Sequence, residues 1–195
     1  WMADWKKGSR SAEYMPQKPV TPEIWRIMRE ADSSFHKDEG GDILSSDQYL
    51  QFLVTELKPF IDREYPSLSG TKDTFLIGSS MGGLISAYAI TEYPDIFGGA
   101  ACMSTAWDVG QGVVVDWFSH HWPTAGGNRL YFDYGTETLD ANYGPSQQKM
   151  DEVMRKFGYA EGVDWMTKRF EGADHTPRAW RERLHIPLKF LLSKS

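Results

Sequence analysis

The order of apolar and polar positions along the chain predicts strands that alternate with helices. Short apolar runs typical of buried strands cover 74–77, 96–104, 129–134 and 164–170. Apolar residues recur at the 3.6-residue spacing of amphipathic helices in four further segments, 84–93, 113–120, 146–157 and 176–192. This alternation predicts an α/β fold, with a mostly parallel sheet of about four strands flanked by helices.

The chain before the first of these strands has a different pattern. Residues 1–44 carry several prolines and a glycine pair, so we expect an irregular N-terminal segment with one short helix at about Pro22–Ala31. Ser45-x-x-Gln48 resembles a capping box that starts a longer amphipathic helix. Pro59 should kink or split that helix near Leu57, because proline lacks the backbone N–H.

Composition limits the class of protein. The 195 residues fit a single domain spanning 1–195, and a hydrophobic content of 41% suffices for a core. A net charge of −6 without a long basic run excludes nucleic acid as an expected partner. No apolar run approaches the roughly 20 residues that span a membrane. The single cysteine, Cys102, excludes an intrachain disulfide and is expected to be a buried thiol.

Candidate chemistry begins with a serine motif between the first predicted strand and the helix behind it. Gly78-Ser79-Ser80-Met81-Gly82 fits G-x-S-x-G, which in this context is typical of a sharp turn that lifts a nucleophilic Ser80 above the sheet. We expect both glycines to be required because a Cβ would collide where strand and helix pass closely. The backbone N–H of Met81 should point to a developing oxyanion. An ordinary Gly/Ser turn is the alternative.

A serine nucleophile needs a base, and the chain has five histidines. His175 follows the last predicted strand, at the carboxyl end of the sheet where ligands bind. His185 falls inside the C-terminal helix, and His36 lies in a charged loop. His120 and His121 are neighbours without a third metal ligand in view, so we expect no metal site there.

An acid should hold the histidine, and in an α/β-hydrolase it follows the preceding strand. The loop GTETLDANY offers Glu137 and Asp140, of which Asp140 is preferred. Asp133 lies inside the strand and is expected to be structural, while Asp174 is a poor partner for its own neighbour. The resulting chain order of serine, acid and histidine matches this fold.

Five segments of the chain together resemble a known esterase family of α/β-hydrolases, which includes enterochelin esterases, feruloyl and acetyl-xylan esterases and esterase D-like enzymes. The segments are RSAEYMP (10–16), YLQFLVTELKPFID (49–62), FLIGSSMGGLISAYA with YPDIFGGAACMS (75–104), YFDYGTETLD (131–140) and GADHTPRAWRERLHIPLKFLL (172–192). By this resemblance Ser80 is the nucleophile, His175 the base and Asp140 the acid. The resemblance implies a serine carboxylesterase that needs no metal or organic cofactor.

The substrate implied by the resemblance is a short-chain or a sugar- or aryl-linked carboxylic ester. Three tryptophans, Trp107, Trp117 and Trp122, could stack on such a group, or they could fill the core. Acyl transfer on the same triad is an alternative that the residues do not separate from hydrolysis. A catalytically weak hydrolase that acts as a binding module is a second alternative.

The sequence departs from the family at its beginning. In the family a long block precedes the segment that starts at Arg10, and it supplies the first strands of the sheet and a loop with a second oxyanion donor. The fold is therefore expected to be N-terminally truncated. The segment Trp1–Arg10 is polar and unlike a signal peptide, which favours the cytoplasm, but the missing block weakens that argument.

Without its usual neighbour, the strand that carries Ser80 becomes an unpaired edge, which native proteins cover. We therefore predict a homo-oligomer, a dimer or larger, in which another copy of the chain covers this edge. Light scattering measures the mass in solution, and a strictly monomeric species would contradict the prediction.

Overall fold

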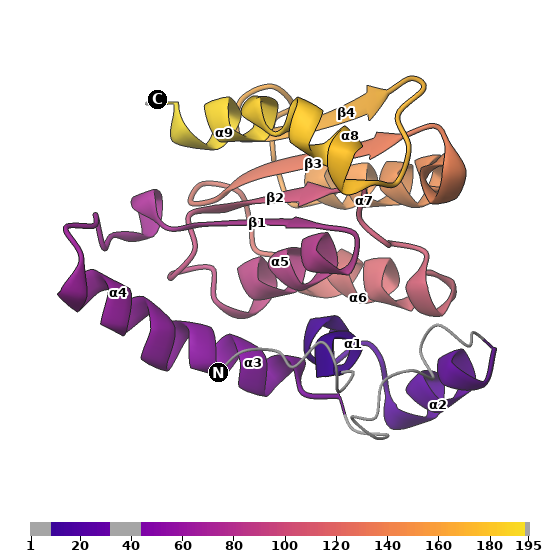
Figure 1. Cartoon of the computed structure of the whole chain (residues 1–195), viewed down its shortest axis with the longest axis horizontal. Coiled ribbons are helices and arrows are strands. Elements are labelled where there is room, and N and C mark those ends of the chain that lie inside the picture. Colours follow the sequence, from indigo (N-terminus) through magenta and orange to yellow (C-terminus); the bar gives the residue numbers. More distant parts are fainter. Residues whose placement is uncertain (1–8, 32–43, 194–195) are drawn as a thin grey trace.

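Four parallel strands in the order β1-β2-β3-β4 form the sheet in the computed structural model, which describes residues 9–31 and 44–193 (Figure 1). The strands are β1 (Phe75–Ser79), β2 (Gly99–Met103), β3 (Arg129–Gly135) and β4 (Trp165–Phe170). In register, Gly99 of β2 lies opposite Phe75 and Arg129, and Leu130 lies opposite Trp165. Each strand overlaps a segment predicted from the sequence, so the α/β class and the parallel sheet are confirmed.

Helices precede β1, fill each connection between the strands and follow β4. The helices are α1 (Ser9–Tyr14), α2 (Pro22–Ala31), α3 (Ser46–Phe52), α4 (Lys58–Glu64), α5 (Met81–Glu92), α6 (Val113–His121), α7 (Gly144–Lys156), α8 (Pro177–Arg183) and α9 (His185–Leu192). Shorter helical turns are the π-helix Leu53–Leu57 and the 3₁₀ turns Thr71–Asp73, Val109–Gly112 and Thr138–Asn142. Across the described residues, none of these helices has the length and apolar character needed to cross a bilayer.

The two faces of the sheet are covered by different helices, because successive side chains of a strand point to opposite faces. On β2, Ala101 and Met103 pack with α8 and α9, whereas Ala100 and Cys102 join the larger core that contains α5, α6 and α7. The same alternation places Tyr131 of β3 on the α9 side. Cys102 is fully buried, as expected from its apolar surroundings.

The described residues of the N-terminal segment are more regular than the sequence indicated. The helix predicted at Pro22–Ala31 is confirmed as α2, but the described residues before it also form α1, so an irregular segment was wrong there. Ser45 is the N-cap of α3, yet its side chain makes no capping hydrogen bond, so the capping box was wrong. The pair Gly40-Gly41 and His36 lie outside the described residues.

Two prolines change the helices that contain them. The chain passes from α3 through a π-helical turn into α4, where Pro59 occupies the first turn. The predicted split near Leu57 was wrong, because the helix continues from α3 into α4 (Figure 1), with a change to π-helical hydrogen bonding at Leu53–Leu57. The expected C-terminal helix is divided at Leu184, because Pro187 has no N–H to continue the hydrogen-bond ladder.

In the described part of the chain, β1 pairs with β2 and with no other strand, so it forms the predicted edge of the sheet. Ile77 of β1 is 42% exposed. This exposure is unusual, because the strands of parallel sheets are normally buried on both faces. A groove of about 350 Å³ runs along this edge between β1 and residues of α1 and α3, including Tyr14 and Tyr49. The oligomer that would cover the edge stays a prediction.

The glycines around Ser80 have unequal roles. A Cβ on Gly78 would lie 2.1 Å from the carbonyl oxygen of Gly82, so strand and helix touch here through bare backbone. A Cβ on Gly82 would meet nothing within 4 Å, so the expectation that Gly82 avoids a collision was wrong. The second crowded position is Gly83, whose Cβ would lie 2.3 Å from Oγ1 of Thr105.

Replacing these glycines by alanine should therefore have opposite effects on stability. Gly78→Ala should lower the free energy of unfolding by about 1–3 kcal/mol or more, because backbone must move. Gly82→Ala, the matched control inside α5, should be neutral or stabilising by up to about 1 kcal/mol through helix propensity. Urea unfolding of both variants measures the difference, and equal destabilisation would contradict the packing described above.

Candidate active site

Ser80 occupies a strained turn between β1 and α5. Its backbone has φ 57° and ψ −124°, a region that residues with a Cβ rarely enter. The Ser80 N–H donates a hydrogen bond to the Met103 carbonyl at 2.9 Å, which ties the turn to the end of β2. The result is the sharp strand-to-helix turn expected from G-x-S-x-G, with a half-buried serine at its top.

A cavity of about 680 Å³ opens beside this turn and is lined by Ser80 and Met81. Helix α2 contributes three apolar side chains to its wall, those of Ile24, Ile27 and Met28. The other lining residues come from α1, the segment after β2 and the segment after β3: Arg10, Ser11, Ala106, Asp108, Val109, Gly110, Gln111, Leu139 and Tyr143. The serine therefore faces a mainly apolar cavity with a few charged groups.

Met81 is the first residue of α5, so its backbone N–H has no acceptor within the helix. The positive end of the helix dipole adds to the same position. The side chain of Met81 is buried, and its sulfur lies 3.8 Å from Nη1 of Arg10. A backbone donor thus follows Ser80 directly, and its role toward an oxyanion stays a prediction.

His175 and Asp140 meet at the same end of the sheet. Nδ1 of His175 lies 2.5 Å from Oδ1 of Asp140, whose side chain is fully buried, while the His175 side chain is 11% exposed. An ionised carboxylate only accepts hydrogen bonds, so Nδ1 carries the proton, and in the neutral imidazole the lone pair is then on Nε2. Glu137, the alternative acid, is exposed.

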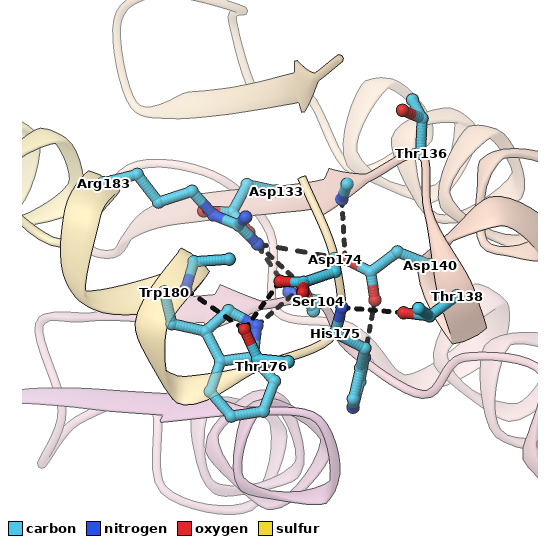
Figure 2. A network of polar contacts seen from close by, with 12 residues as sticks. Ser104, Asp133, Thr136, Thr138, Asp140, Asp174, His175, Thr176, Trp180 and Arg183 are labelled. Carbon is cyan, nitrogen blue, oxygen red and sulfur yellow. Dashed lines mark hydrogen bonds and ion pairs between the residues drawn. The ribbon is translucent and has the colours of Figure 1, made fainter. Parts of the chain in front are cut away.

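The loops that carry the acid and the histidine are joined by their backbones. The carbonyl of Ala173 accepts hydrogen bonds from the N–H groups of Thr136 and Glu137, both at 3.0 Å. The N–H of His175 donates to Oγ1 of Thr138 at 2.9 Å (Figure 2). These contacts fix the distance between the two loops and therefore between Asp140 and His175.

Two aromatic rings flank the imidazole of His175. The ring centroid of Trp180 lies 5.0 Å and that of Tyr143 5.7 Å from the His175 centroid, each nearly perpendicular to it. Such edge-to-face contacts restrict the ring to one orientation. The imidazole is therefore held by packing as well as by Asp140.

The charge state of Asp140 follows from its surroundings. Burial alone would raise the pKa of Asp140, but hydrogen bonds from His175, Ser104 and the Gly135 N–H together hold that pKa below its ordinary value. The Gly135 N–H donates to Oδ2 at 2.6 Å, and a Cβ on Gly135 would lie 2.1 Å from the Ala173 carbonyl oxygen. Asp140 is thus a buried carboxylate that stays ionised.

Sequence reasoning missed three residues that surround this carboxylate. Ser104 donates to Asp140, and Arg183 and Trp180 of α8 donate to Ser104. Asp133, expected to be structural, forms a buried ion pair with Arg183. Ser104 could have been identified from the sequence, since it directly follows β2 at the carboxyl end of the sheet, where Ser80 and His175 also lie.

The other histidines that the structure describes lie away from Asp140. His120 and His121 are exposed on α6, and their Nδ1 atoms contact the carbonyls of Asp116 and Trp117. His185 is exposed at the start of α9. Among the described residues, no three or more His, Cys, Asp or Glu side chains are grouped so that they could hold a metal ion.

The tryptophans considered as stacking surfaces belong mainly to the core. Trp107 and Trp122 are 1% and 2% exposed, and Nε1 of Trp107 donates to Gln147. Trp117 stacks on His121 with the ring centroids 4.2 Å apart. The interpretation that these rings fill the interior is therefore favoured.

The strained serine turn and the buried Asp140–His175 pair thus lie together at one end of a parallel sheet. The family model described as "Putative esterase" matches residues 28–191. The chain belongs to this family.

Comparison with individual proteins agrees with the family. An uncharacterized protein of Bacillus subtilis, YjcH, is 32% identical over 74 residues, which cover 38% of this chain and 29% of YjcH. Two solved structures share the fold: the enterobactin esterase of Shigella flexneri (TM-score 0.60, 20% identity) and a ferulic acid esterase (TM-score 0.57, 17% identity). Each match covers 73% of this chain, but 38% and 60% of the respective structures, so the chain spans only part of these proteins.

The lowered pKa of Asp140 predicts how stability depends on pH. A carboxyl group whose folded pKa is depressed stabilises the fold above its unfolded pKa, about 3.9, and loses that contribution as the pH falls through the lower folded pKa. The difference in unfolding free energy between the wild type and Asp140→Asn should be constant near neutral pH and shrink below about pH 4. Urea unfolding at pH 7, 5, 4 and 3 measures it, and a difference that widens in acid would contradict the assignment.

Proposed function

We propose that the protein is a serine carboxylesterase in which Ser80 is the nucleophile, His175 the general base and Asp140 the acid. The observation that carries the proposal is the buried pair of Asp140 and His175, in which Oδ1 lies 2.5 Å from Nδ1. The pair lies at the same end of the sheet as the strained turn of Ser80. Family membership supports the same reaction class. The identity of Ser80 as the nucleophile rests on its position and conformation.

The reaction follows from the roles of these groups. Ser80 Oγ attacks the ester carbonyl while its proton passes to Nε2 of His175, and Asp140 stabilises the resulting imidazolium. The Met81 N–H donates to the oxyanion of the tetrahedral intermediate. The alcohol leaves with the proton from His175, and water then releases the acyl group from Ser80 by the same route.

The cavity next to Ser80 supports a substrate class. Apolar side chains of Ile24, Ile27, Met28 and Leu139 favour an acyl or aryl group over a highly charged one. Ile27 and Leu139 are 50% and 62% exposed, so the cavity is open and suits short-chain or aryl-linked esters. The ferulic acid and enterobactin esterases among the similar structures are named for aryl-containing substrates, which agrees with this class.

The proposal is tested by covalent labelling. A fluorophosphonate should modify the wild type at Ser80, as located by mass spectrometry of peptides, because the reagent reacts with serines activated by a base. Ser80→Ala should not be labelled and should lose esterase activity by about 10⁴-fold or more, the effect of removing the nucleophile of a triad. Assays with p-nitrophenyl esters of increasing acyl length measure the activity.

The neighbouring Ser79 offers a matched control, since Ser79→Ala removes a hydroxyl from the end of β1. It should keep the labelling at Ser80. A folded wild type that is not labelled, or that is labelled at another residue, would overturn the proposal.

A further inference from the structure

Ser104 lies at the centre of the polar network around the candidate acid (Figure 2). It directly follows β2, is fully buried and has φ 41°, a positive value that residues with a Cβ rarely adopt. Its Oγ lies 2.5 Å from Oδ2 of Asp140, 2.7 Å from Nη2 of Arg183 and 3.0 Å from Nε1 of Trp180. The strained backbone of Ser104 thus places its hydroxyl within reach of three partners.

The direction of these hydrogen bonds is determined by counting donors. A serine hydroxyl has one proton and two lone pairs, whereas a guanidinium N–H and an indole N–H can only donate. Arg183 and Trp180 therefore use both lone pairs of Ser104 Oγ. The single proton of Ser104 is left for the Asp140 carboxylate.

This arrangement gives the two oxygens of Asp140 separate tasks. Oδ2 accepts from the Ser104 hydroxyl and from the Gly135 N–H, and Oδ1 faces Nδ1 of His175. Two donors from different strands on one oxygen fix the plane of the carboxylate. The other oxygen then points at the histidine without competing partners among the described residues.

The donor to Ser104 is itself anchored. Arg183 of α8 forms two hydrogen bonds through Nη2 and Nε to Asp133, at 2.9 and 3.2 Å, and its guanidinium lies 4.9 Å from the ring centroid of Phe170. Asp133 balances the charge of Arg183, which approaches Asp140 only to 3.9 Å. Arg183 therefore orients Ser104 while the Asp140 charge remains available to the histidine.

We propose that Ser104, held by Arg183 and Trp180, is a positioning residue that aims the Asp140 carboxylate at His175. It acts through Asp140 and does not touch the substrate. The proposal rests on the esterase mechanism above. Because Trp180 also packs against the His175 ring, α8 controls the acid and the base together.

Ser104→Ala tests the proposal, because it removes the hydroxyl and keeps the Cβ. We expect kcat to fall by about 10- to 100-fold, because a hydrogen bond to a charged group is lost, with KM within about twofold of the wild type. The far-downfield proton resonance of the His175 Nδ1–H in one-dimensional NMR should weaken or move upfield. A loss of packing alone would not produce this spectroscopic change.

The adjacent Thr105 provides the control variant. Its hydroxyl is also buried but makes no hydrogen bond among the described residues, so Thr105→Val should leave kcat and the downfield resonance unchanged. Trp180→Phe provides a milder second variant, which removes one donor to Ser104 and keeps a ring beside His175. It should lower kcat by about 2- to 10-fold.

The outcomes separate this proposal from the function on which it rests. Wild-type labelling at Ser80, together with a Ser104→Ala variant of unchanged kcat and unchanged resonance, would overturn the positioning role alone. A decrease confined to KM, or an equal loss of kcat in Thr105→Val, would overturn it as well. If Ser104→Ala does not fold, an unchanged kcat and resonance in Trp180→Phe would overturn it. Absence of labelling in the wild type counts against the esterase mechanism itself.

Discussion

A carboxylate that is buried away from water must be stabilised by hydrogen-bond donors, and the site is built around this requirement of Asp140. Its side chain is fully buried, so an unmatched charge would cost several kcal/mol. The Gly135 N–H, the Ser104 hydroxyl and His175 meet it from three separate segments. Each of these donors restricts the backbone that carries it, and together they determine how the ends of β2, β3 and β4 sit relative to one another.

The parallel sheet makes this convergence possible. Because all four strands run in the same direction, the segments that follow them all begin at the carboxyl end of the sheet. Ser80, Ser104, Asp140 and His175 are found there. Helix α8 then returns across the sheet face that carries Met103 and Tyr131 and brings Arg183 to Asp133. The apolar contacts of α8 and α9 with the sheet thus also position the polar network, so packing and chemistry depend on the same helices.

Much of the site could be predicted from local sequence. The turn at Ser80 follows from glycine at Gly78 and from the change of periodicity around it, and His175 follows from its place after the last strand. The sequence favoured Asp140 over Glu137 but left both open, because they lie in one loop; in the structure Asp140 is buried against His175 and Glu137 is exposed. Ser104 and Arg183 lie 79 positions apart, and no local pattern connects them.

The sequence by itself determined the class of fold, the strand that carries Ser80 and the order of the three candidate catalytic residues, because these depend on periodicity and on short-range turn chemistry. Tertiary structure alone decided that Gly83 rather than Gly82 is crowded, and that Ser104 donates to Asp140. These features depend on which segments meet in space and on which atoms are left to accept or donate there. That information is absent from residue spacing along the chain.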